Sequence, residues 1–113
     1  MTKTQKKLDN KIVKVLTQVC ERAKVEVDGF EWLTHIIEYT KFPDSLCVVC
    51  VFSSDEALAT AKANDQQSLL SDLIVKELAQ IQVSISAKRN IRFNSEDRYR
   101  RDQKVAAAHF RAH

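Results

Sequence analysis

Glycine and proline are almost missing from this chain, whose 113 residues contain one of each, Gly29 and Pro43. Tight turns depend on these residue types, so the sequence has few sites for the closely spaced turns of an all-β sandwich. This scarcity favours a fold that contains helices. Apolar residues make up 44% and charged residues 29% of the chain. These proportions are ordinary for a globular domain and argue against disorder of the whole chain.

Cysteine is scarce and odd in number, with Cys20, Cys47 and Cys50. An odd set cannot form a closed disulfide framework, so we expect a reducing compartment, most simply the cytoplasm. Cys47 and Cys50 have the spacing of a metal-binding or redox pair. On a strand, however, residues three apart point to opposite faces, and we interpret these thiols as small buried hydrophobes.

Long hydrophobic runs are missing as well. The longest uninterrupted apolar run is 46–52, far short of the ~18–20 residues that a membrane helix needs. The positive charges of residues 1–10 are not followed by an apolar segment, whereas a secretory signal has one. We therefore expect no membrane partner.

Motifs for catalysis and for metal or cofactor binding do not occur in recognisable form. There is no glycine-rich phosphate loop. His35 lies among aromatic residues, and no nucleophile stands at a spacing that implies a dyad. His109 and His113 are four apart, as helical metal ligands are, but they belong to the last five residues, where fraying is expected. The sequence thus predicts a protein that is not an enzyme, with no catalytic residue, metal or cofactor.

The first half of the chain predicts a helix followed by a β-hairpin. Residues 1–8 read as a disordered polar tail, and Asp9 or Asn10 as the cap of a helix that runs to about Val27. Gly29 stands where a left-handed helix terminus belongs. Residues 30–52 predict two strands around a turn that contains Pro43, although 30–40 would also tolerate a helix. In a strand, Phe30, Trp32, Thr34 and Ile36 would share one face.

The second half predicts two helices, one or two short strands and a last helix. Ser53 and Glu56 have the spacing of a capping box, which opens a helix to about Ala63. Leu69, Leu70, Leu73, Ile74, Leu78 and Ile81 form the apolar stripe of the next helix. Residues 83–85 and 91–93 alternate as strands do, with a turn between them. Ser95 caps a basic C-terminal helix or tail, 95–113.

The predicted fold is therefore α+β, a single domain over 1–113 in the order α-β-β-α-α-β-(β)-α, with helices packed on a small antiparallel or mixed sheet. This order resembles the layout of type II KH domains, an RNA-binding fold. KH domains clamp nucleotides with a Gly-x-x-Gly loop. A chain whose only glycine is Gly29 cannot supply that loop, so the resemblance is one of topology.

Positive charge gathers at the C-terminal end. Residues 88–113 contain six of the seven arginines and carry eight cations against three acids, a net charge of +5. Residues 1–87 carry ten cations and twelve acids, a net charge of −2. Such asymmetry is typical of proteins that bind polyanions. The candidate anion-binding or nucleic-acid-binding residues are Lys88, Arg89, Arg92, Arg98, Arg100 and Arg101.

Acids of the last helix have the spacing to neutralise part of this charge. Three pairs have i,i+4 spacing: Glu96–Arg100, Asp97–Arg101 and Arg98–Asp102. Pairs of this kind predict a solvated helix laced with ion pairs. Lys88, Arg89 and Arg92, on a turn and a strand, then remain as the predicted centre of an anion site.

Two functions follow from these features. One is association with DNA or RNA through the basic C-terminal region. The alternative is a protein-interaction or homo-oligomerisation module, in which the thin stripe of Tyr99, Ala106 and Phe110 docks on another protein or on a second copy. Phe30, Trp32 and Tyr39 have the composition of a base-stacking platform, but we interpret them as core aromatics.

Overall fold

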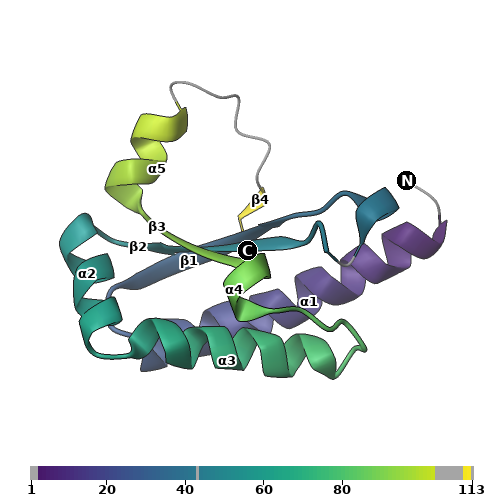
Figure 1. The fold of residues 1–113 in the computed structure, drawn as a ribbon, viewed down its shortest axis with the longest axis horizontal. Coiled ribbons are helices and arrows are strands. Elements are labelled where there is room, and N and C mark those ends of the chain that lie inside the picture. The colour runs from purple at the N-terminus through teal and green to yellow at the C-terminus, as the bar shows by residue number, and fades with distance from the viewer. Residues whose placement is uncertain (1–2, 43, 104–110, 113) are drawn as a thin grey trace.

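The computed structural model describes residues 3–42, 44–103 and 111–112. The elements in these ranges are α1 (Lys3–Glu26), β1 (Phe30–Ile36), η1 (Tyr39–Lys41), β2 (Cys47–Phe52), α2 (Asp55–Ala63), α3 (Gln66–Ala79), α4 (Ala87–Asn90), β3 (Ile91–Ser95), α5 (Glu96–Gln103) and β4 (Arg111–Ala112). The strand order is β3-β2-β1-β4. Helices α1 and α3 cover one face of the sheet, and α5 rises on the other side (Figure 1). The predicted α+β class, with helices packed on a small mixed sheet, is confirmed.

Helix α1 begins at Lys3, ahead of the predicted cap at Asp9 or Asn10 and within the segment that was expected to be a polar tail. Its apolar residues recur at spacings of three and four, which places them on one face of the helix. The buried members of this stripe are Ile12, Leu16, Val19, Cys20 and Ala23. They pack the middle and the second half of the helix against the sheet and α3.

The predicted left-handed glycine is confirmed. α1 ends at Glu26, and Gly29 follows with a φ of +81°, a conformation that costs little without a side chain. A Cβ at this position would lie 2.8 Å from the Cβ of Ala57. Gly29 therefore turns the chain into β1 and also leaves room for α2.

Strands β1 and β2 pair antiparallel, so the hairpin prediction is confirmed and β1 is not a helix. The predicted common face is wrong at its first residue, because a bulge shifts the register between Phe30 and Trp32. Phe30 consequently shares a face with Leu33 and packs edge-on against Phe52, with ring centroids 6.0 Å apart. Trp32 lies on the opposite face, beside α5.

Helices α2 and α3 follow the prediction with a shifted start. The cap of α2 is Ser54, not Ser53, and its hydroxyl accepts the amide hydrogen of Ala57 at 3.0 Å. On α3 the apolar stripe is split between a buried part and an open part. Leu70, Ile74 and Leu78 are buried. Leu69 keeps 49% of its surface exposed.

The C-terminal third differs most from the prediction. Val83 is buried, but residues 83–85 form no strand. The strand predicted at 91–93 exists as β3 and pairs parallel with β2. Of the basic helix or tail predicted over 95–113, the structure describes α5 (Glu96–Gln103) and Arg111–Ala112, which pair antiparallel with β1 as β4. The positions His109, Phe110 and His113 lie outside the described residues.

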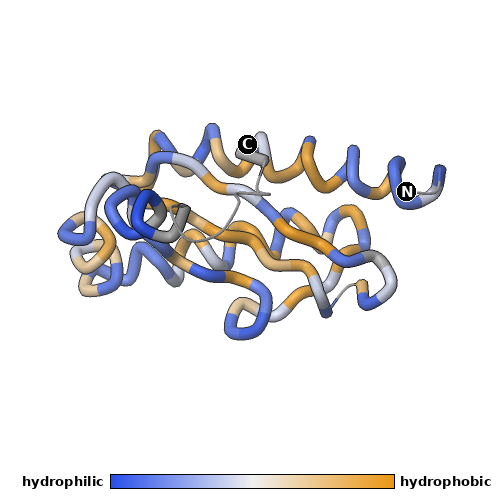
Figure 2. Tube along the Cα trace, turned by 90° about the horizontal axis from the view of Figure 1, so that it is seen from above, coloured by the Kyte–Doolittle hydropathy of each residue, from blue (hydrophilic) through white to orange (hydrophobic). Residues whose placement is uncertain are grey.

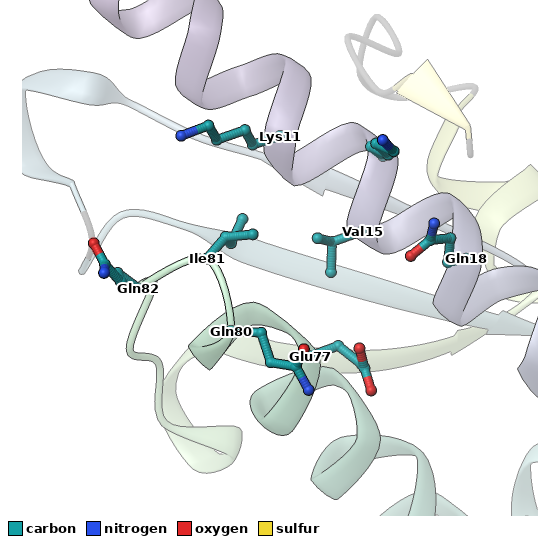
Figure 3. A pocket seen from close by; sticks show the side chains of 8 residues that line it. Lys11, Val15, Gln18, Glu77, Gln80, Ile81 and Gln82 are labelled. Atoms are coloured by element: carbon teal, nitrogen blue, oxygen red, sulfur yellow. The ribbon is translucent and has the colours of Figure 1, made fainter.

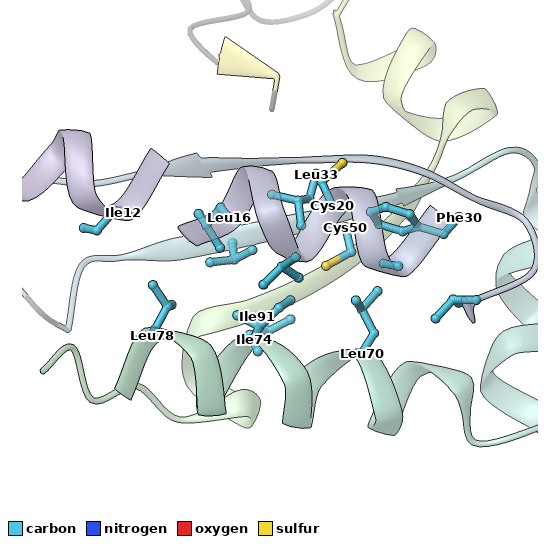
Figure 4. Close-up of a cluster of buried hydrophobic side chains, with 14 of the residues drawn as sticks. Ile12, Leu16, Cys20, Phe30, Leu33, Cys50, Leu70, Ile74, Leu78 and Ile91 are labelled. Carbon is cyan, nitrogen blue, oxygen red and sulfur yellow. The ribbon is translucent and has the colours of Figure 1, made fainter. Parts of the chain in front are cut away.

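The hydrophobic core lies between the sheet and the pair α1 and α3. Figure 2 shows apolar residues concentrated along the strands and on the inner turns of α1. Figure 4 shows Leu16 of α1, Leu33 of β1 and Ile74 of α3 converging on the same interior. No described helix is both long enough and apolar enough to span a membrane.

Candidate functional site

The basic C-terminal region divides into two groups at opposite ends of β3. Lys88 and Arg89 lie on the short helix α4 just before the strand, and Arg92 is its second residue; we call these three the β3 cations. The α5 arginines are Arg98, Arg100 and Arg101. β3 has five residues, which separates the two groups by roughly 13 Å along the strand. The two groups therefore lie at the two ends of one strand.

A buried asparagine holds the β3 cations in place. Asn90 is 3% exposed, and its side-chain amide donates to the carbonyl oxygen of Leu46 at 2.8 Å and to that of Asp44 at 3.3 Å. Its side-chain oxygen accepts the amide hydrogen of Ser86 at 2.9 Å. These bonds join the entry of β3 to the turn ahead of β2. They fix the backbone from which Lys88 and Arg89 project.

Two of the β3 cations already contact other groups of the same chain. Arg89 Nη1 lies 3.4 Å from Asp44 Oδ1, and both side chains are largely exposed. Arg92 Nη1 donates to the carbonyl oxygens of Lys88 and Ile91, each at 3.1 Å. This folds the Arg92 side chain back toward the backbone of Lys88, while Arg89 is turned toward Asp44. Asp44, the acid beside Arg89, lies ahead of β2.

Helix α5 is anchored through its first turn. Ser95 Oγ accepts the amide hydrogen of Arg98 at 3.1 Å, which confirms the predicted cap, and its hydroxyl donates to the carboxylate of Asp55. The indole of Trp32 donates to Glu96 Oε1 at 2.6 Å. Asp97 Oδ2 accepts the amide hydrogen of Asp55 at 3.4 Å. α5 is thus tied to both α2 and β1.

These anchors replace two of the three predicted ion pairs of the last helix, Glu96–Arg100 and Asp97–Arg101. Glu96 accepts a hydrogen bond from the Trp32 indole instead of pairing with Arg100. Arg101 lies 3.8 Å from Asp55 on α2 instead of pairing with Asp97. The third predicted pair depends on Asp102, whose side chain lies outside the described part of the chain. Arg98 and Arg100 are exposed and form no ion pair with any described residue.

The interpretation of the Cys47–Cys50 pair as buried hydrophobes is confirmed for Cys50, whereas Cys47 is only partly buried. Cys47 and Cys50 are on opposite faces of β2, and all three cysteines are free. Burial raises the pKa of Cys50 strongly. Burial also raises the pKa of Cys47, against the opposing effect of the nearby Arg92 charge. In residues 3–42, 44–103 and 111–112, no three His, Cys, Asp or Glu side chains are grouped as metal ligands.

The interpretation of the aromatic residues as core residues is confirmed for Phe30 and wrong for Trp32. Phe30 is buried in the core, whereas Trp32 lies on the other face of the sheet and donates a hydrogen bond to Glu96. The side chain of Tyr39 lies outside the described part of the chain. A further pair that sequence reasoning missed joins His35 Nε2 and Asp9 Oδ1, which are 3.1 Å apart. Its members are 26 residues apart, and no local pattern links them.

A further group of cations was hidden when the net charge was summed over residues 1–87. Five lysines lie on the first half of α1: Lys3, Lys6, Lys7, Lys11 and Lys14. Their net contribution disappears when residues 1–87 are counted together, because most acids of that segment come later. The regular spacing of three and four is visible in the sequence and would have located them.

Comparison with known proteins found no matching family model, no similar curated protein and no similar solved structure. The likeness in element order to type II KH domains therefore carries no functional argument. Function has to be inferred from the surface itself.

Proposed function

We propose that this protein is a non-enzymatic nucleic-acid-binding protein that contacts the phosphate backbone with its α5 arginines and β3 cations. The observation that supports this most is the occupation of the two first-turn acids of α5. Glu96 and Asp97 accept hydrogen bonds from Trp32 and from the Asp55 amide. Arg98 and Arg100 are consequently left for a ligand.

Arginine suits this role because its planar guanidinium donates two parallel hydrogen bonds to a phosphate. The anchoring of α5 keeps the backbone that carries these side chains in one position, so less ordering is needed when the ligand binds. Phosphate contacts supply affinity without reading sequence. We therefore propose binding that depends weakly on base sequence and strongly on salt.

We also propose that the protein resides in a reducing compartment, most simply the cytoplasm. Its support is the free state of Cys20, Cys47 and Cys50. Two of these thiols, Cys20 and Cys50, are buried, where free cysteine behaves as a small hydrophobe.

The test is the double variant Arg98→Gln/Arg100→Gln, compared with Lys62→Gln/Lys76→Gln, which removes the same charge from α2 and α3. Fluorescence anisotropy with labelled mixed-sequence DNA and RNA duplexes, between 50 and 300 mM salt, gives affinity and its salt dependence. We expect the slope of log K against log salt to fall by about 0.9 for each phosphate that is no longer neutralised, only in the arginine variant. Equal slopes for the two variants would exclude the α5 arginines.

One observation favours self-association as a second candidate. β1 has seven residues, and the two described residues of β4 pair with Thr34 and His35 on its outer edge. A short strand leaves backbone groups that an extended segment of another chain can use. Light scattering of the full chain and of a version that ends at Gln103 tests this. A monomer in both cases rejects it.

A further inference from the structure

The first half of α1 carries a lysine stripe, which we define as Lys3, Lys6, Lys7, Lys11 and Lys14. All five side chains are exposed. Spacings of three and four place residues on one helical face, and the stripe extends about 16 Å at 1.5 Å per residue. Figure 2 shows the outer turns of this part of α1 as hydrophilic.

The only acid in this part of the helix faces away from the stripe. Asp9 Oδ1 lies 3.1 Å from Nε2 of His35 on β1, and the side chains of Asp9 and His35 are 19% and 6% exposed. The carboxylate is therefore turned toward the sheet. It does not neutralise the stripe as an interspersed acid on the outer face would.

The stripe also opposes the electrostatics of its own helix. The N-terminus of a helix carries a positive partial charge, which favours acids, yet the first turn of α1 contains none. Like charges three or four residues apart repel one another, as at Lys3–Lys7 and Lys7–Lys11. A bound polyanion would relieve both effects.

The second half of the same helix provides the contrast. Arg22 and Glu26 form an i,i+4 ion pair with Nε and Oε1 3.2 Å apart, and Glu21 lies near Lys24 in the sequence. That half has the mixed charges of an ordinary solvated surface. The lysine stripe is therefore a local feature of α1, not a property of the whole helix.

A groove of about 520 Å³ runs beside the C-terminal end of the stripe, between α1 and the end of α3 (Figure 3). Its polar lining is mostly ammonium and amide groups, and Glu77 is the single acid in it. The residues that line it are Lys11, Lys14, Val15, Gln18, Glu77, Gln80, Ile81 and Gln82. Gln82 has a φ of +64°, a left-handed conformation that costs energy for a residue with a side chain. The groove thus continues the stripe with hydrogen-bond donors.

We propose that the lysine stripe and this groove form a second nucleic-acid surface, which binds the phosphate backbone of a duplex. The stripe lies on the helical layer and α5 on the other side of the sheet (Figure 1). One molecule can therefore hold two duplex segments. The inference takes its ligand class from the proposed function, but it does not depend on the α5 arginines.

The chemistry of the surface selects a duplex over other polyanions. The exposed side chains of residues 3–14 include no aromatic group on which single-stranded bases could stack. They include no apolar group either, whereas a helix that docks on an anionic membrane inserts an apolar face. Backbone contacts by point charges remain, and these fit a double helix.

The decisive variant is Lys3→Gln/Lys7→Gln/Lys11→Gln, with Lys24→Gln/Lys62→Gln/Lys76→Gln as a control of equal charge. Circular dichroism verifies folding, and anisotropy with a mixed-sequence duplex measures binding against salt. We expect the salt slope of the stripe variant to fall by about 0.9 for each phosphate that its lysines no longer neutralise, and that of the control to stay unchanged. Equal slopes would overturn the inference, as would stronger binding of the full chain to single strands or to phosphatidylserine vesicles.

A bridging assay tests the second part. An immobilised duplex captures a second, fluorescent duplex through the protein. We expect the full chain to capture it, and expect the stripe variant and Arg98→Gln/Arg100→Gln each to bind without bridging. Capture by the stripe variant at the full-chain level would overturn the proposal. If only the stripe variant loses capture, the lysine stripe is a binding site and the α5 arginines are not. If only the arginine variant loses capture, the α5 arginines are a binding site and the stripe is not.

Discussion

The α5 arginines and the lysine stripe lie on opposite sides of the sheet and carry their charge differently (Figure 1). Around α5, acids are close by but are occupied by Trp32, Ser95 and backbone amides, so the arginines are organised by a hydrogen-bond network. Along the first half of α1 there is one acid, and His35 holds it on the sheet side. A charge count along the chain found the first region and concealed the second.

This difference has a consequence for stability. The arginine regions depend on tertiary contacts, and removing these contacts should both destabilise the fold and displace the cations. The lysine stripe needs only its helix, and its charges oppose that helix. Variants in the two regions should therefore change stability in opposite directions.

The largest expected effect is at the anchor of the β3 cations. Asn90→Ala removes the partners of the Leu46 and Asp44 carbonyls and of the Ser86 amide. We expect the free energy of unfolding to fall by about 2–4 kcal/mol, because buried polar groups lose their hydrogen bonds. Urea unfolding measures this, with the exposed Asn10→Ala on α1 as control. A change as small as that of the control would contradict the anchoring role.

A smaller effect is expected at the link between the sheet and α5. Trp32→Phe removes the indole donor to Glu96 but keeps most of the aromatic contact area. We expect the free energy of unfolding to fall by about 1–2 kcal/mol, since the acceptor is a partly buried carboxylate. A double-mutant cycle with Glu96→Gln isolates the pair. No coupling between Trp32 and Glu96 would show that α5 is held by other contacts.

Charge reversal on the lysine stripe should have the opposite sign. Lys3→Glu/Lys6→Glu places acids at the positive end of α1, and we expect the free energy of unfolding to rise by on the order of 0.5–1 kcal/mol. The same variant should weaken duplex binding. Lys24→Glu, in the last turn of the same helix, is the matched control and should lower stability. A loss of stability in Lys3→Glu/Lys6→Glu would break the contrast between the two regions.

Local pattern was enough to predict most of the fold. The period of α1 and α3, the hairpin of β1 and β2, and the left-handed Gly29 are each encoded within a few residues. The bulge after Phe30 was not predictable, because it depends on pairing with β2. Residues 83–85 alternate as a strand does but form none. Tertiary context decided both cases.

The candidate site was less predictable because its contacts are distant in sequence. Trp32 and Glu96 are 64 residues apart, and Asn90 and Leu46 are 44 apart. Spacing within the last helix suggested pairs for Glu96 and Asp97 that the tertiary contacts replace. The lysine stripe was a local pattern, and averaging the charge over 87 residues concealed it.

The smallest expected effect tests where Arg92 lies. Burial raises the pKa of Cys47, and the Arg92 charge opposes this rise. Arg92→Ala removes the opposing charge, so the pKa of Cys47 should rise further. The thiolate fraction at a given pH then falls, and alkylation by iodoacetamide should become slower, with its pH profile displaced to higher pH. Mass spectrometry of the modified peptide measures the rate at Cys47. Arg100→Ala, on the other basic group, should leave that rate unchanged. Equal rates in the Arg92 variant and the unmodified chain would place the Arg92 guanidinium too far from Cys47 to influence its thiolate.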